Sequence, residues 1–416
     1  MLNTFTIKKD AIINAFTMFL FASFVIFDKN PFISLILLCI SVVIFIIHAS
    51  KKSYRISIRF GPYHYFVIAF SMYTLASALW ANNPAWSIQK AITIFEILVC
   101  MSILYLHYSE CESVAVLLKT VAIGGTLIAV YCFCFFGIGT MINWIMSGEN
   151  IEGEITNQNT LGLVCAFAFI LSVYYIYENK WYAIGLIPCL LVVAASTSRK
   201  ALILLALGTI AVLLIRSESR NPIYTLLKLV GIIIVVGILL GIIIKLNIFS
   251  GVNERMKGLI ALISGVWEID NSTNLRQMMI AKGLKQFSKT PLVGIGIGNA
   301  GTLEIKGYNY LHNNYVELLA CGGIVGFLIY YSMYFYIIAN LVKYRKYEGK
   351  LSKLIFCLVM LILMMDYGLV NYYDKATYFY LLIFFLHIRN LKEKKRKGRS
   401  YSRDVDDSVL VDCVEI

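Results

Sequence analysis

The chain has 416 residues, of which 59% are hydrophobic and 15% charged, and its formal net charge is +13. A water-soluble core cannot hide this much apolar side chain, so the composition excludes an ordinary soluble protein and predicts a membrane protein. The positive charge does not indicate nucleic-acid binding, because the excess lies in short loops and in the tail after Arg389. The ten cysteines form no CxxC pair and lie mostly in apolar segments, which predicts neither a disulfide framework nor a metal site.

Apolar runs recur from the N-terminus to about residue 388, and a spanning helix needs about 20 mostly apolar residues. We therefore predict an all-α, polytopic membrane protein of about 12 transmembrane helices with one large extracytoplasmic loop that contains helices. The first helix follows Lys8 and Lys9 and is expected to remain as a signal anchor. The predicted helix cores are 12–27, 31–48, 63–80, 89–106, 115–136, 160–177, 181–196, 200–215, 225–245, 313–341, 354–370 and 375–388.

The distribution of Lys and Arg orients these helices, because cytoplasmic loops of membrane proteins are rich in both. With the N-terminus in the cytoplasm, an even number of helices also places the basic segments 51–59 and 343–353 and the basic tail there. Residues 1–390 then form the membrane domain, and residues 391–416 form a cytoplasmic tail that is expected to contact anionic lipid.

The longest predicted connection, residues 247–311, lies outside the membrane in this topology. Loops of this length are often functional, and the basic residues of this one predict an anionic partner. Within the loop, residues 274–287 have the period of a helix, which would place Arg276 in the first turn. A cation is unfavourable there unless an anion is bound, although an ordinary solvated arginine is the alternative. The residues expected on one face of this helix are Leu275, Met278, Met279, Gly283 and Phe287.

Pro291 and three alternating glycines, Gly294, Gly296 and Gly298, follow this helix. Their spacing excludes a dinucleotide-binding fingerprint. Two interpretations stay open, a phosphate cradle and a tight re-entrant turn close to the membrane.

The loop ends at His312, at the outer mouth of the next predicted helix. A histidine there is suited to act as a general base near neutral pH, although a packed or surface histidine is the alternative. Glu317 lies little more than one turn deeper, and Gly322, Gly323 and Gly326 are expected to allow close packing of neighbouring helices.

Arg199 and Lys200 lie in a hairpin that the topology places on the same outer side as Arg276 and His312. Snorkelling of their side chains to lipid headgroups is the alternative. Two arginines matched to a diphosphate, together with a base, predict a transferase site.

The sequence resembles the bacterial O-antigen ligase and O-antigen polymerase superfamily. The resemblance lies in Ser198-Arg199, in Asn274-Leu275-Arg276 leading to Pro291-Leu-Val-Gly294-Ile-Gly296, in His312-Asn313-x-x-x-Glu317 followed by Gly323 and Gly326, and in the segments 80–84 and 157–159. It implies a metal-independent glycosyltransferase without a cofactor, acting on glycans carried by undecaprenyl diphosphate at the outer face of the cell membrane. It also implies that Arg199 and Arg276 engage the diphosphate and that His312 assists attack by the acceptor hydroxyl.

The expected partners are the lipid-linked glycan donor, the glycan acceptor and membrane lipids, with chain-length regulator and flippase proteins as further candidates. Nucleic acid is not expected. The residues expected to bind substrate are Lys200, Asn313, Glu317, Lys289 and Asn159.

Three functions are consistent with this sequence. A repeat-unit polymerase is favoured because abundant Ile, Lys, Asn and Tyr suggest a low-GC genome, and many such bacteria make capsule or exopolysaccharide without a lipid A core. A ligase that transfers polysaccharide to lipid A core or another acceptor is the first alternative. A lipid-linked oligosaccharide flippase is the second, because Glu96, Lys119 and Asp366 lie inside apolar runs. The sequence lacks the matching pair of interrupted helices typical of transporters.

Overall fold

A computed structural model describes residues 9–27, 60–109, 113–147, 155–217, 271–305, 308–347 and 349–396, together with some of residues 30–43. Over these residues the fold is all-α, as predicted, with an isolated β-bridge between Ile305 and Tyr308. The α-helices are α1 (Lys9–Ile26), α3 (Pro62–Ala76), α4 (Pro84–Tyr108), α5 (Ala115–Phe136), α6 (Ile138–Ser147), α7 (Gln158–Tyr175), α8 (Leu186–Ala195), α9 (Arg199–Arg216), α12 (Asn271–Lys289), α13 (Asn314–Lys343), α14 (Lys350–Asp366) and α15 (Lys375–Arg396). Short 3-10 helices are η1 (Ser77–Leu79), η2 (Lys180–Gly185), η4 (Asn299–Leu303) and η5 (Arg345–Tyr347).

The predicted helices that fall on described residues are confirmed to within a few residues, and the one at 181–196 consists of η2 followed by α8. The predicted cores 31–48 and 225–245 lie largely or wholly outside the described residues, as does the first part of the predicted loop. Two differences concern helix length. The ten-residue α6 is shorter than a span and was not predicted. Helix α15 continues to Arg396, into the segment assigned to the tail.

Four helices of the described chain, α4, α5, α7 and α13, are long and apolar enough to cross a membrane. Large apolar side chains on the outside of the bundle, such as Tyr65 and Phe335, are exposed over 64% and 75% of their surface. Such surfaces suit lipid rather than water. The helices therefore have the character of a membrane protein, whereas the count of about 12 spans remains a prediction.

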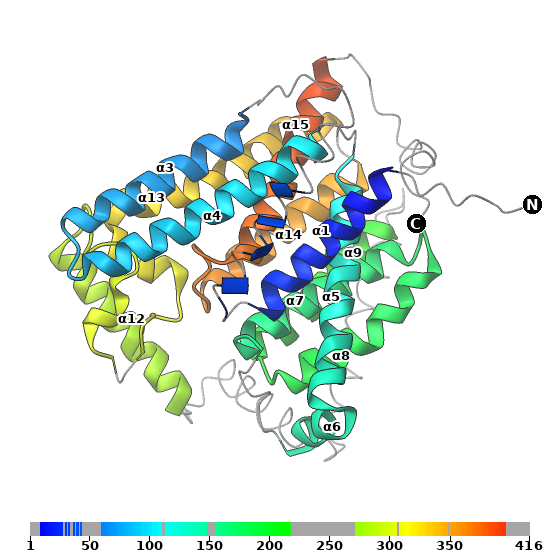
Figure 1. Cartoon of the computed structure of the whole chain (residues 1–416), viewed down its shortest axis with the longest axis horizontal. Helices are drawn as coiled ribbons and strands as arrows, with labels where there is room; N and C mark the ends of the chain where they lie inside the picture. The colour runs from blue at the N-terminus through cyan, green and yellow to red at the C-terminus, as the bar shows by residue number, and fades with distance from the viewer. Residues whose placement is uncertain are drawn as a thin grey trace, which may run out of the picture.

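The helices form two groups joined through α14 and α15 (Figure 1). In one group α3 packs on both α4 and α13, and α12 lies against α13. In the other, α7 packs on α5, α8 and α9, and α1 packs on α5. Residues 376–388 of α15 are all buried between the groups, because an all-round apolar helix is stable only when it is covered on every side.

Helix α13 is interrupted at Gly323, where φ is 60° and ψ is −168°. A side chain at this position would meet the backbone of Leu292 at 2.3 Å. The backbone N–H groups just after the break donate to the segment that follows α12, Ile324 N to Pro291 O at 2.8 Å and Val325 N to Leu292 O at 3.2 Å. Groups that leave the helical ladder therefore regain partners, as an apolar environment requires.

The glycine segment after Pro291 is a tight turn against α13 rather than a phosphate cradle. Its N–H groups are used within the protein: Gly294 N donates to Thr290 O at 3.1 Å and Ile295 N to Ala320 O at 3.2 Å. The segment is also joined to the α3–α4 connection, where Asn82 N donates to Ile295 O at 3.1 Å. Close packing at Gly323 is confirmed, and Gly322 and Gly326 pack closely on Ile297 and Tyr73.

Replacement of Gly294 by Ala is expected to destabilise the protein. Its φ is +66°, and a Cβ atom would lie 2.4 Å from the carbonyl of Cys321. We expect the thermal unfolding midpoint in detergent to fall by about 5 °C or more. The matched control is Gly139→Ala in α6, where a Cβ atom meets nothing within 4 Å. Equal midpoints for the two variants would contradict the close approach.

Candidate functional site

His312 lies in the short segment between the β-bridge and α13, with a positive φ of 54°. This conformation is uncommon for a residue with a side chain and persists only where the surroundings enforce it. On one side, Leu311 N donates to Glu317 Oε2 at 2.7 Å. On the other, Asn313 caps α13 by accepting a hydrogen bond from Val316 N at 3.0 Å. The backbone on both sides of His312 is therefore held in place.

Glu317 has only 1% of its surface exposed, and both of its carboxylate oxygens are engaged within the protein. Besides the bond from Leu311, its Oε1 accepts a hydrogen bond from the Tyr372 hydroxyl at 3.1 Å. Glu317 thus joins the His312 segment to the α14–α15 connection. Sequence analysis expected Glu317 and Asn313 to bind substrate, and the geometry favours positioning of His312 for both.

A second buried network joins the same elements through Asn314. Its Oδ1 accepts hydrogen bonds from Asn371 N at 2.8 Å and Tyr372 N at 3.2 Å. Its Nδ2 donates to Asp366 Oδ2 at 3.2 Å, and Asp366 also accepts from the Tyr331 hydroxyl at 2.9 Å. The α14–α15 connection is therefore held beside the start of α13.

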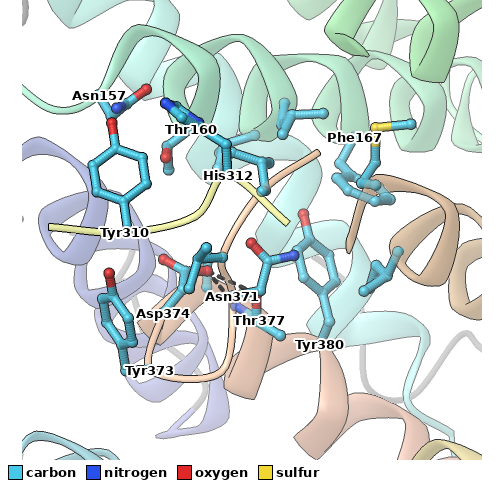
Figure 2. Close-up of a pocket in the computed structure, with 17 residues that line it drawn as sticks. Asn157, Thr160, Phe167, Tyr310, His312, Asn371, Tyr373, Asp374, Thr377 and Tyr380 are labelled. Carbon is cyan, nitrogen blue, oxygen red and sulfur yellow. Dashed lines mark hydrogen bonds between the residues drawn. The ribbon is translucent and has the colours of Figure 1, made fainter. Parts of the chain in front are cut away.

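Two cavities meet at His312. The polar cavity, of about 430 Å³, is lined by Asn157, Gln158, Asn159, Leu275, Arg276, Tyr308, Tyr310 and His312. The inner cavity, of about 200 Å³, lies between α7, the end of α14 and the start of α15 and is shown in Figure 2. Asn157, Tyr310 and His312 line both cavities and form the boundary between them.

Burial, which is the largest cause, and the positive charges of Arg276 and Lys200 together lower the pKa of His312 to about 4. The imidazole is therefore neutral near pH 7 and can accept a proton. The Tyr310 ring lies 4.4 Å from the imidazole in an edge-on arrangement. Burial raises the pKa of Tyr310, which keeps its hydroxyl protonated.

Arg276 lines the polar cavity, but its place on the helix differs from the prediction. Helix α12 begins at Asn271, so Arg276 lies in the second turn, because the polar residues before Asn274 continue the helix. The conflict with the helix dipole is correspondingly weaker. A stronger conflict comes from Lys200, whose like charge opposes that of Arg276. An anion bound between them would relieve this repulsion.

The α9 hairpin presents Lys200 as well as Arg199 to this region. Arg199 is the first residue of α9, and Ser198 caps the helix while its hydroxyl donates to Asn159 Oδ1 at 3.0 Å. The side chain of Lys200 lies against Gly368, where an added Cβ would be 2.6 Å from Nζ. Lys200 and Arg276 are the cations that lower the pKa of His312.

Lys289 lies apart from the other predicted site residues. It is exposed at the end of α12. An α-helix rises about 1.5 Å per residue, so Lys289 is about 20 Å from Arg276 along the axis. On the predicted apolar face of α12, Met279 is fully buried, whereas Met278 is 41% exposed, contrary to the prediction.

Sequence reasoning missed the residues of the inner cavity, among them Thr160, Tyr373, Asp374 and Tyr380. They come from α7, the α14–α15 connection and α15, and no local pattern links these distant segments. Tyr308 and Tyr310 carried the only usable signal, as aromatic residues just before His312. Among the described residues, no three His, Cys, Asp or Glu side chains gather in a way that could hold a metal ion.

Glu317→Ala is expected to destabilise the protein more than Tyr372→Phe. The alanine variant leaves the Leu311 N–H and the Tyr372 hydroxyl without their acceptor, at about 1–3 kcal/mol for each buried donor. Tyr372→Phe removes one donor and leaves Glu317 Oε1 without it, but retains the bond from Leu311 N, and Glu317→Gln retains one acceptor oxygen and should fall between the two variants. Thermal unfolding in detergent measures the order, and equal midpoints would show that the carboxylate does not hold this segment.

Comparison with known proteins gives one family. The family model described as O-antigen ligase matches residues 184–331, which extend from the end of η2 into α13. The match contains Arg199, Lys200, Arg276 and His312. No curated protein matches the chain. The family match supports, over residues 184–331, the resemblance to the O-antigen ligase and polymerase superfamily seen in the sequence.

Proposed function

We propose that the protein polymerises undecaprenyl-diphosphate-linked oligosaccharide repeat units into capsular, exo- or O-antigen polysaccharide at the outer face of the cytoplasmic membrane. The observation that carries the proposal is the polar cavity at His312, in which a neutral imidazole lies within the field of Arg276 and Lys200. The family match supports a ligase- or polymerase-like function.

The charges of the polar cavity suit a diphosphate. Arg276 and Lys200 repel each other when the cavity holds no anion, and Arg199 begins the helix that carries Lys200. A diphosphate would relieve the repulsion and would gain charge-assisted hydrogen bonds. Asn159, held by Ser198 at the wall of the same cavity, could then donate to a phosphate or sugar oxygen through its amide.

The proposed reaction is a displacement at the anomeric carbon of the donor sugar. The oxygen of the acceptor hydroxyl forms a bond to that carbon, and the hydroxyl proton passes to a ring nitrogen of His312. The bond from the anomeric carbon to the diphosphate oxygen breaks, and the electron pair leaves with the diphosphate. Arg276, Arg199 and Lys200 stabilise the charge that develops on the leaving group, so the reaction needs no resident metal.

The proposed topology places this site on the outer face, with both termini in the cytoplasm and about 12 spanning helices. It agrees with the position of the ion pairs formed by Glu178, which lies between α7 and η2, in the segment predicted to be cytoplasmic. Glu178 Oε2 lies 3.1 Å from Lys119 Nζ, and Glu178 Oε1 lies 2.7 Å from Arg216 Nη2. Lys119 and Arg216 therefore share an acidic partner, Glu178, at the end of the bundle that this topology places in the cytoplasm.

The ligase alternative shares the donor site and differs in the acceptor, and the family match fits a ligase and a polymerase equally. The composition of the chain favours the polymerase. The flippase interpretation loses its main support. Two of the charges that suggested it, Lys119 and Asp366, are bound to Glu178 and to the Asn314 network.

Replacement of His312 or Arg276 by Ala is expected to stop chain growth. Without the base, or without the cation at the leaving group, the rate should fall by about 100-fold or more. Single lipid-linked repeat units should then accumulate on the outer leaflet of the producing strain, with long chains absent, as measured by separating the extracted glycans by length. Lys285→Ala, an exposed lysine on the same helix, serves as the matched control.

Three other outcomes of this experiment have distinct meanings. Normal chain lengths in both variants would refute the proposal. Repeat units trapped on the inner leaflet would favour the flippase. Long chains that fail to reach their final acceptor would favour the ligase.

The pH dependence of the reaction is expected to differ between the free protein and its complex with the donor. His312 is active when neutral, so kcat/KM should fall as the pH drops through about 4, the pKa in the free protein. A bound diphosphate adds negative charge beside the imidazole and raises its pKa, so the acid limb of kcat should lie at a higher pH. Lys200→Met removes a nearby cation and should move the limb of kcat/KM to higher pH. Coincident limbs, or a shift to lower pH in the variant, would contradict the assignment of His312 as base.

A further inference from the structure

The inner cavity opens beside the polar cavity but has a different lining. Only Asn157, Tyr310 and His312 are common to both. The remaining walls come from α7, the end of α14, the α14–α15 connection and the start of α15, as Figure 2 shows. A group held in this cavity would reach His312 without occupying the space beside Arg276.

The lining of the inner cavity favours an uncharged ligand over an anion. It contains no Lys or Arg, and Asp374 is its one acidic side chain. The Oδ2 atom of Asp374 accepts hydrogen bonds from Thr377 N and Thr377 Oγ1, both at 2.8 Å, at the start of α15. These bonds keep the carboxylate fixed at the cavity wall. A diphosphate would be repelled there, whereas the hydroxyl groups of an uncharged sugar could donate to it.

A buried hydroxyl in the cavity lacks a partner. Tyr380 is only 3% exposed, and its hydroxyl oxygen has no hydrogen-bond partner among the described residues. In Figure 2 this hydroxyl points into the space between α7 and the α14–α15 connection. A buried polar group without a partner is costly, so it marks a place where a ligand can supply the missing bond.

The shape and the apolar walls of the cavity suit a single sugar. The volume of about 200 Å³ is sufficient for one monosaccharide, such as the terminal sugar of a glycan. The rings of Phe167, Tyr373 and Tyr380 offer apolar surfaces for the C–H groups of a sugar, and Thr160 and Asn371 add polar groups. A hydrocarbon chain would match the apolar walls but would leave the buried Tyr380 hydroxyl without a hydrogen bond.

We propose that the inner cavity is the acceptor subsite, which binds the terminal uncharged sugar of the growing or incoming glycan and presents its attacking hydroxyl to His312. This inference rests on the polymerase function proposed above and adds the location of the second substrate. Tyr380 forms a hydrogen bond with a sugar hydroxyl, and Asp374 accepts another. The donor diphosphate lies in the polar cavity, so the two substrates approach His312 from separate spaces.

The test compares Tyr380→Phe with the unchanged protein in purified form. The donor is the intact lipid-linked repeat unit, extracted from a strain that lacks this protein. The acceptor is the same oligosaccharide after release from its lipid diphosphate by mild acid and labelling at the reducing end, so that it cannot act as a donor. Loss of one hydrogen bond should raise the KM for the labelled acceptor about five- to ten-fold and leave the KM for the donor unchanged.

Tyr63→Phe is the matched control. Tyr63 is fully buried in α3, its hydroxyl also has no partner among the described residues, and it does not line the cavity. Its removal should leave both KM values unchanged. A second variant, Thr160→Phe, adds a ring at the wall of the cavity and should raise the KM for the labelled acceptor while leaving the KM for the donor unchanged.

The outcomes separate the inference from the function on which it rests. An unchanged acceptor KM in Tyr380→Phe would overturn the acceptor subsite, and a raised donor KM with an unchanged acceptor KM would assign the cavity to the lipid chain instead. Absence of labelled product with the unchanged protein would contradict the polymerase function itself.

Discussion

Backbone groups that leave a helical ladder inside an apolar bundle must find new partners, and in α13 they find them in the segment that follows α12. Pro291 and Leu292 lie against the break at Gly323. Their carbonyl oxygens accept hydrogen bonds from Ile324 N and Val325 N. One turn earlier, Ala320 O receives Ile295 N. These bonds fix the first part of α13 relative to the loop, and this part of the helix carries Asn313, Asn314 and Glu317. The position of His312 therefore depends on a broken helix whose gap is filled by another part of the chain.

At the site, hydrogen bonds restrain the backbone around His312, and the like charges of Arg276 and Lys200 repel each other. His312 is held in a left-handed backbone conformation by Glu317 and Asn313, and buried side chains tie this segment to the α14–α15 connection. Arg276 and Lys200 add like charges from two helices that are distant in sequence. Such a cluster is unfavourable in the free protein and becomes favourable around an anion, because binding converts mutual repulsion into shared attraction. The repulsion between Arg276 and Lys200 thus favours binding of an anion in the polar cavity. The same charges also help to keep the imidazole of His312 neutral, so that the imidazole can accept a proton.

The sequence predicted the helices well because length and hydropathy are local properties, and the described helices follow the apolar runs closely. Through the positive-inside rule, the sequence also predicted that Arg276, Lys200 and His312 lie on the same side of the membrane. It proposed Arg199 and Arg276 as the two cations of the diphosphate site, whereas Arg276 and Lys200 are the cations that lower the pKa of His312. The break at Gly323 was not predictable, because three neighbouring glycines fit a continuous, closely packed helix equally well. The positioning role of Glu317 was missed for a similar reason, since Tyr372 lies 55 residues away and joins it only through folding. The inner cavity depends on the same kind of long-range packing.

The two cavities indicate where a polymerase and a ligase would differ. Both reactions use a glycan on a lipid diphosphate, so the polar cavity, with Arg276 in its wall and the charge of Lys200 nearby, would be the same for either. They differ in the group that attacks, and that group must approach His312 from the other side of the boundary formed by Asn157 and Tyr310. Acceptor identity is then read by the walls of the inner cavity, where Asp374 and the unpartnered Tyr380 hydroxyl select for uncharged, hydroxyl-rich groups. A phosphorylated acceptor would meet the carboxylate of Asp374 in a lining that contains no Lys or Arg, and this argues for a neutral terminal sugar as the attacking group.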